Sequence, residues 1–302
     1  MLVNNTYVEK TMVWTALITP MLENGRIDID SLGELVQAQT KAGNGIVLFG
    51  STGEGLALTL DEKKAILKNV LDMQSLPPIM VGVGGFHLSE QLSWLAFCET
   101  LNISAYLMVV PLYAKPGPVG QTAWFEALLN KVTKPCMLYN VPTRVGTVLH
   151  PQVLNNLKDN PYLWAVKEAS GNIAAFKTYQ TAAARLSICL YSGDDVLMPQ
   201  LAKAGAKGLV SVASNIWPEA VRRYAEFCLS DHLDASMQAL WKQASEACFC
   251  APNPLPVKLL LTRQGKINSA YCRPPLSQNE QVNYALLKMA DRAVNAWYEG
   301  VK

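Results

Sequence analysis

Eight short apolar runs recur at a regular pitch along the first 212 residues. Their starts lie 20 to 33 residues apart, which leaves room for a helix after each run. Continuous apolar runs of this length are typical of strands that are buried on both faces, as in a parallel sheet. The runs are Val13–Ile18, Ile46–Phe49, Ile79–Val81, Tyr106–Val110, Cys136–Tyr139, Leu163–Lys167, Ile188–Tyr191 and Gly208–Val212.

Amphipathic helical patterns fill the intervals between these runs. Acidic residues stand near the expected helix starts, where the helix dipole favours them, as at Asp61-Glu62 and Ser89-Glu90. Eight strand–helix units in about 220 residues predict an α/β fold, a closed (β/α)8 TIM barrel. The helix faces expected to be buried carry Leu32, Leu35 and Val36 in one helix and Leu88, Leu92 and Leu95 in another.

A doubly wound sheet is the alternative arrangement of alternating strands and helices. It would normally carry a ligand-binding turn directly after its first strand, where this chain has Thr19-Pro20. The segment Gly82-Val83-Gly84-Gly85 lacks the G-x-G-x-x-G spacing, and we interpret it as a tight turn after the third strand. The barrel is therefore favoured.

The pattern changes from about Asp231, where helical periodicity takes over and continues to Trp297-Tyr298. The prolines of 251–256 (A-P-N-P-L-P) separate two of these helices. We predict a catalytic barrel domain at residues 1–230 and a C-terminal helical appendage at residues 231–302.

Composition argues against several classes of partner. Lys and Arg number 26 and Asp and Glu 24, with no run of charge, so nucleic acid is not expected as the main partner. No apolar stretch reaches ~18 residues and no signal sequence is seen, so we expect no membrane partner and a cytoplasmic location. The seven cysteines lie mostly in apolar runs, as buried thiols do, and the three histidines lack ligand spacing, so neither a metal nor a cofactor is expected.

In a barrel the active site lies at the carboxyl ends of the strands. After the second run comes G-S-T-G-E-G at 50–55, whose glycines, N–H groups and hydroxyls at Ser51 and Thr52 can cradle an anion. A plain polar turn is the alternative.

The fifth run ends in Tyr139, a candidate general acid or base, and is followed by Arg144, whose guanidinium can bind a carboxylate through two hydrogen bonds. In isolation, a packed tyrosine and a surface arginine are the alternatives.

Lys167 closes the sixth run, which is unusual because lysine is rarely buried without a partner. At the inner mouth of a barrel its pKa would fall from ~10.4 toward neutrality, and the neutral amine could attack a carbonyl. A lysine that reaches solvent is the alternative. Together with the anion cradle and Tyr139 at the same mouth, Lys167 indicates a Schiff-base enzyme that acts on a small α-keto acid.

Six motifs in order make the chain similar to a known family, the dihydrodipicolinate synthase / N-acetylneuraminate lyase family of class I aldolases. The resemblance extends from about Val13 to Leu276. The motifs are G-S-T-G-E at 50–54, Y-x-K-P at 113–116, Y-N-V-P-x-R at 139–144, V-K-E-A-S-G-N at 166–172, S-G-D-D at 192–195 and N-P-x-P-V-K at 253–258.

The resemblance implies roles for the residues of these motifs. Lys167 would form an imine with pyruvate, and Tyr139 would be the general acid/base beside it. Ser51 and Thr52 would hold the pyruvate carboxylate. Ser51 would also join a proton relay that Tyr113 completes from the neighbouring subunit. This role of Tyr113 implies a homo-oligomer, commonly a tetramer built as a dimer of dimers.

The resemblance also implies a substrate-binding set. Gly193 and the carbonyl of Val210 would line the pocket, and Arg144 would bind the carboxylate of L-aspartate 4-semialdehyde, as in the synthase branch of the family. The alternatives are another pyruvate-dependent aldolase of the family, such as a lyase of N-acetylneuraminate or of a sugar acid, and a catalytically retired barrel that acts as a binding protein.

Departures from the family pattern affect regulation more than chemistry. Synthases usually carry Thr-Thr where this chain has Ser51-Thr52, and lyases often carry Ser-Thr. Family members inhibited by lysine bind it through polar residues at the dimer interface. Most of the matching residues here cannot form those contacts, so we expect insensitivity to L-lysine. These residues are Leu60, Lys63, Phe86, Glu90 and Leu112.

Overall fold

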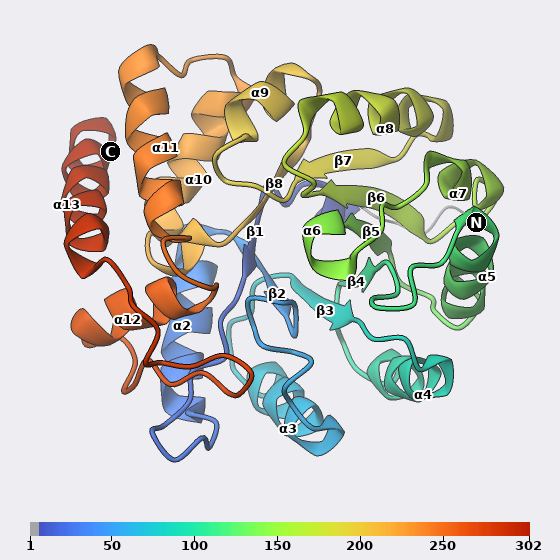
Figure 1. Cartoon of the computed structure of the whole chain (residues 1–302), viewed down its shortest axis with the longest axis horizontal. Helices are drawn as coiled ribbons and strands as arrows, with labels where there is room; N and C mark the ends of the chain where they lie inside the picture. Colours follow the sequence, from blue (N-terminus) through green and yellow to red (C-terminus); the bar gives the residue numbers. More distant parts are fainter. Residues whose placement is uncertain (1–5) are drawn as a thin grey trace.

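Eight parallel strands close into a barrel in sequence order, β1 to β8, in a computed structural model that describes residues 6–302 (Figure 1). The pairing of β1 with β8 closes the barrel. Each predicted apolar run coincides with a strand, and the ends of run and strand differ by at most two residues, so the predicted fold class is confirmed. The strands are β1 Val13–Ala16, β2 Gly45–Leu48, β3 Ile79–Val83, β4 Ala105–Val109, β5 Cys136–Asn140, β6 Leu163–Glu168, β7 Cys189–Ser192 and β8 Gly208–Ser211.

Helices surround this barrel (Figure 1). The helices that precede or alternate with the strands are α1 Thr6–Glu9, α2 Ile29–Ala42, α3 Leu60–Leu71, α4 Leu88–Glu99, α5 Pro118–Leu129, α6 Pro142–Val145, α7 Pro151–Asn156, α8 Ile173–Leu186 and α9 Met198–Lys203, followed by the 3-10 turn η1 Ala213–Asn215 and α10 Pro218–Leu229. The C-terminal helices are α11 Ala235–Ala247, α12 Leu255–Arg263 and α13 Tyr284–Val301.

Helices α2 and α3 begin where the sequence supplies a cap. The Asp28 carboxylate accepts a hydrogen bond from the Ser31 amide at the start of α2, and Thr59 and Glu62 form a reciprocal capping box at the start of α3. The predicted apolar face of α2 is buried as expected.

Helix α4 buries a different face from the predicted one. Leu95 is buried, but Leu92 is only partly buried and Leu88 is exposed. Trp94 occupies the inner face, where its indole N–H donates to the Gly82 carbonyl over 3.1 Å and its ring contacts Phe49. The bulky indole therefore decides the rotation of this helix.

The glycines after the third run also differ from the prediction. Gly82 and Val83 belong to β3, so the turn begins at Gly84. A Cβ at Gly82 would lie 2.6 Å from the Phe49 carbonyl oxygen, and the glycine is therefore needed for the close approach of two strands rather than for a turn.

The C-terminal helices lie together beside α10, on one side of the barrel (Figure 1). Trp241 of α11 stacks on Tyr224 of α10 with 4.5 Å between ring centroids, and both belong to the same buried apolar cluster as the barrel. Helices α12 and α13 are joined by a segment with neither helix nor strand, contrary to the helical pattern expected there. The division into domains at residue 230 stays a prediction. The first five residues of the predicted barrel domain lie outside the part of the chain that the structure describes.

All seven cysteines are free thiols, and five of them are buried, as predicted. Within residues 6–302, none of the helices combines the length and apolar character that crossing a membrane requires.

Candidate active site

The carboxyl ends of β5 and β6 bring Tyr139 and Lys167 together. The two residues are register partners in neighbouring parallel strands. The Lys167 Nζ atom lies 4.1 Å from the centroid of the Tyr139 ring. The amine therefore lies over the face of the tyrosine ring, and the two residues predicted to share the barrel mouth lie side by side.

Lys167 is 5% exposed, and its pKa is lowered to about 7. Burial is the main cause, because it removes water from the charged form. The positive charge of Arg144 acts in the same direction, and Asp195 acts against it. Near neutral pH, about half of the Lys167 population therefore carries the neutral amine that can attack a carbonyl.

Tyr139 is also buried, and burial raises the pKa of its phenol above the usual value. The charge of Arg144 and a hydrogen bond with Ser51 oppose this shift, whereas Glu168 adds to it. Tyr139 therefore stays protonated at neutral pH. It can donate a proton to a reacting group and exchange protons with the Ser51 hydroxyl.

The turn after β2 is held in an uncommon backbone conformation. Phe49 and Glu54 have φ angles of 62° and 52°, in the left-handed region. A Cβ at Gly55 would lie 2.0 Å from the Phe49 carbonyl oxygen, so only glycine fits there. This tight turn exposes Ser51 and buries Thr52, whose hydroxyl accepts a hydrogen bond of 3.0 Å from the Asn253 side chain.

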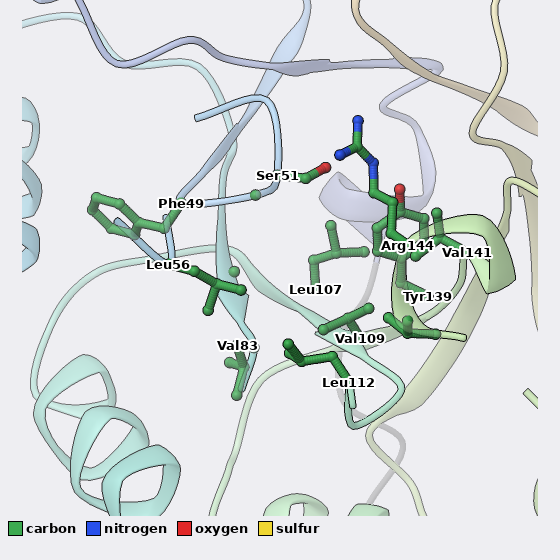
Figure 2. A pocket seen from close by; sticks show the side chains of 14 residues that line it. Phe49, Ser51, Leu56, Val83, Leu107, Val109, Leu112, Tyr139, Val141 and Arg144 are labelled. Carbon is green, nitrogen blue, oxygen red and sulfur yellow. The ribbon is translucent and has the colours of Figure 1, made fainter. Parts of the chain in front are cut away.

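Two cavities meet at the site and share Ser51, Tyr139, Val141 and Arg144. The polar cavity, of about 550 Å³, also contains Lys167, Thr52 and Gly193 among its lining residues. The apolar cavity, of about 250 Å³, extends toward β3 and β4. In Figure 2 its apolar side chains, Leu56, Val83, Leu107 and Leu112, lie below Ser51.

Gly193 provides the space that Lys167 occupies. A Cβ at position 193 would lie 2.7 Å from the Lys167 Cε atom. The wall at the end of β8 is formed by Val212. Val210 lies two residues earlier, buried within β8 and paired with Trp14 of β1, and the contact of its carbonyl with a substrate stays a prediction.

Tyr113, also predicted to be catalytic, does not lie near Lys167 within a single chain. Its side chain is 84% exposed, its φ angle is 67°, and its ring packs beside that of Phe86 with 6.3 Å between centroids. It lines neither of the two cavities at the site. Leu112, its neighbour, does line the apolar cavity.

Three lining residues of the polar cavity come from the C-terminal part of the chain and were not predicted: Glu246, Phe249 and Asn253. Asn253 is the first residue of the N-P-x-P-V-K motif, and this motif was the available signal that it belongs to the site. Taken alone, an asparagine between two prolines is typical of a turn. The sequence offers no comparable signal for Glu246, because an acidic residue in a helix is usually solvated. The appendage therefore contributes directly to the site.

The chain as a whole is similar to known proteins. The model of the dihydrodipicolinate synthetase family matches residues 9–291. A 4-hydroxy-tetrahydrodipicolinate synthase of Francisella philomiragia is 46% identical over 289 residues, which cover 96% of this chain and 97% of the relative. A synthase of the same name from Wolbachia pipientis is 40% identical over 293 residues, which cover 97% and 99%.

Solved structures agree with this relationship. The chloride-inhibited dihydrodipicolinate synthase of Acinetobacter baumannii, complexed with pyruvate, has a TM-score of 0.84 at 28% identity and covers 94% of this chain and 99% of its own. A monomeric dihydrodipicolinate synthase variant has a TM-score of 0.88 at 26% identity, with coverage of 96% and 99%. This chain therefore belongs to the dihydrodipicolinate synthetase family.

Proposed function

We propose that this chain condenses pyruvate with L-aspartate 4-semialdehyde, the reaction of a 4-hydroxy-tetrahydrodipicolinate synthase and a step toward diaminopimelate and lysine. The observation that carries the proposal is Lys167, a buried amine with a pKa of about 7 in contact with Tyr139, in a cavity that Arg144 also lines. The activity named for the Francisella and Wolbachia relatives supports the same reaction.

In this proposal the neutral amine of Lys167 attacks the keto carbon of pyruvate, and loss of water gives an imine. Tyr139 protonates the oxygen that leaves as water, and Ser51 relays protons to and from its phenol. The Tyr139 phenolate left by that step takes a proton from the pyruvate methyl group, which gives an enamine. The enamine carbon attacks the aldehyde carbon of the second substrate while the aldehyde oxygen takes the proton back from Tyr139. The amino group of the second substrate then displaces the Lys167 amine from the imine carbon and frees the enzyme. The hydroxyls of Ser51 and Thr52 hold the pyruvate carboxylate throughout.

Arg144 binds the carboxylate of the semialdehyde, because a guanidinium can donate two parallel hydrogen bonds to it. Gly193 leaves room for Lys167, and the carbonyl of Val210 contacts the bound substrate. The Schiff-base route uses the chain's own amine, so the proposal includes neither a metal nor a cofactor. A cytoplasmic location and small-molecule substrates, rather than a nucleic-acid or membrane partner, belong to the same proposal.

We also propose a homo-oligomer, a dimer of dimers, in which Tyr113 of one subunit enters the site of its neighbour. Tyr113, Phe86 and Leu56 are large apolar side chains exposed on one chain, which is typical of an interaction surface. The apolar cavity beside Ser51 has the character needed to receive a tyrosine ring. Because a monomeric variant shares this fold, the assembly needs its own test.

Complementation between subunits tests the assembly. Lys167→Ala and Tyr113→Phe subunits are each expected to be impaired, but a mixed dimer contains one site with both Lys167 and Tyr113. Activity that appears on mixing supports the exchange of Tyr113 between subunits. A mixture no more active than the sum of its parts contradicts it.

A coupled assay with pyruvate and L-aspartate 4-semialdehyde, beside a panel of sugar acids, tests the reaction itself. We expect turnover of the semialdehyde and a borohydride-reduced pyruvate adduct on Lys167, identified by peptide mass and absent in Lys167→Ala. Better turnover of a sugar acid would favour the lyase alternative, to which Ser51-Thr52 is also suited. Neither turnover nor adduct would indicate a retired barrel.

A further inference from the structure

Thr52 is held by a side chain from the far end of the chain. The Asn253 Nδ2 atom lies 3.0 Å from the Thr52 Oγ1 atom, and 201 residues separate the two in sequence. Both side chains are buried, with exposed fractions of 7% and 3%, and both line the polar cavity that contains Lys167. The contact is therefore buried and is part of the site.

The direction of this hydrogen bond determines what Thr52 can offer a substrate. An amide N–H only donates, and a hydroxyl has one proton. Because the Thr52 oxygen accepts from Asn253, its own proton points elsewhere and can be donated to an anion in the cavity. The reversed amide would instead take the Thr52 proton and leave the hydroxyl oxygen facing the anion, which would repel it.

A buried ion pair fixes the two segments beside this contact. Glu54, two residues after Thr52, pairs with Lys258, five residues after Asn253, over 2.5 Å, and their side chains are 2% and 0% exposed. The Lys258 ammonium also donates to the Tyr271 carbonyl over 2.8 Å. Desolvation offsets much of the attraction within a buried pair of this kind, so we infer that its role here is to hold the two segments in one register rather than to add much net stability.

We propose that Asn253 is a positioning residue that sets the donor direction of the Thr52 hydroxyl toward the carboxylate of the keto-acid substrate. The Glu54–Lys258 pair keeps the two segments at the distance that this hydrogen bond requires. The inference rests on the proposed function, in which Thr52 binds the pyruvate carboxylate, and it assigns the C-terminal appendage a part in substrate binding.

A double-mutant cycle between Asn253 and Thr52 tests the inference. Asn253→Ala and Thr52→Val should each raise the KM for pyruvate about 10-fold, as expected for a lost hydrogen bond to a charged group, with a much smaller effect on the KM for the aldehyde. If Asn253 acts through Thr52, Asn253→Ala should add less than about twofold in the Thr52→Val background. Multiplied effects in the double variant would overturn the proposal.

Asn253→Asp gives a second readout, which a merely structural role would not produce. The ionised aspartate would take the Thr52 proton and repel pyruvate, whereas the protonated acid can donate as the amide does. The ratio of its pyruvate KM to that of the wild type should therefore rise with pH through the aspartate pKa. A ratio that does not vary with pH would contradict the inference. Aspartate has nearly the same shape as asparagine, so this variant carries the test if Asn253→Ala does not fold.

Asn268→Ala is the matched control. Asn268 also ties the C-terminal part to the barrel, through a 2.8 Å hydrogen bond to Asp28, but it does not line the cavity. Its pyruvate KM should equal that of the wild type. If wild-type protein gives no pyruvate adduct on Lys167, the proposed function fails. If wild type and Asn253→Ala bind pyruvate equally well, only the inference about Asn253 fails.

Discussion

Gly193→Ala should disable the nucleophile by adding a single methyl group. The new Cβ would lie 2.7 Å from the Lys167 Cε atom, 3.0 Å from its Cγ atom and 2.7 Å from the Ala169 Cβ atom. Carbon atoms prefer ~3.5–4.0 Å, so the Lys167 side chain must move by about 1 Å. A displacement of ~1 Å in a catalytic group can cost about 10²-fold in rate, and overpacking costs about 1–3 kcal/mol of stability.

The assay is the rate at which pyruvate and borohydride label Lys167, followed by peptide mass, together with a thermal melt. We expect labelling to slow about 100-fold in a variant that still folds. Gly300→Ala is the control, because an added Cβ there meets nothing within 4 Å. Labelling of Gly193→Ala at the wild-type rate would refute the claim that this glycine makes room for the reactive amine.

Four further sites give measurable expectations. Pyruvate labelling of Lys167 should rise with pH and reach half its limit near pH 7, because the protonated amine cannot attack; a flat rate between about pH 6 and 8 would contradict the lowered pKa. Arg144→Ala should lower kcat/KM for the semialdehyde about 10- to 100-fold. It should also move the midpoint of Lys167 labelling to higher pH, because a cation that lowers the Lys167 pKa is lost. Arg144→Lys keeps the positive charge and should keep the midpoint. Tyr139→Phe should lower kcat about 10²- to 10⁴-fold without changing the melting temperature, and wild-type turnover would exclude the proton-transfer role. Millimolar L-lysine should not inhibit, because the cavity that Lys63 and Glu90 share is also lined by Leu60, Phe86 and Leu112, and the Lys63 ammonium would repel the ligand. Inhibition that Glu90→Gln abolishes would show the opposite.

The barrel can be predicted from this sequence because each strand is buried on both faces and appears as a continuous apolar run. The errors concern features that depend on neighbours. Sequence alone assigns Gly82 to a turn, because the close approach of the Phe49 carbonyl is visible only in the structure. Leu88 is exposed because Trp94 lies on the buried face of the same helix. Helical spacing alone does not distinguish these choices.

The candidate site was predictable where chemistry and position coincide in the sequence. Lys167 stands out because a lysine closes an apolar run, and the structure confirms that it contacts Tyr139. The contact between Thr52 and Asn253 could not be predicted, because it joins residues 201 positions apart and neither is unusual in its own segment. The residues that Tyr113 would contact in the proposed assembly likewise depend on two chains rather than on one sequence.

The buried pair of Glu54 and Lys258 also bears on how the enzyme is made. A nascent chain has delivered all eight strands once Ser211 has emerged from the ribosome, and barrel closure can start from there. The turn that carries Ser51 and Thr52 still lacks its ionic partner until residue 258 follows, and the amide of Arg273, which donates to the other Glu54 oxygen over 2.8 Å, arrives later still. The turn that carries Ser51 and Thr52 therefore has all of its partners only after nearly the whole polypeptide has been translated.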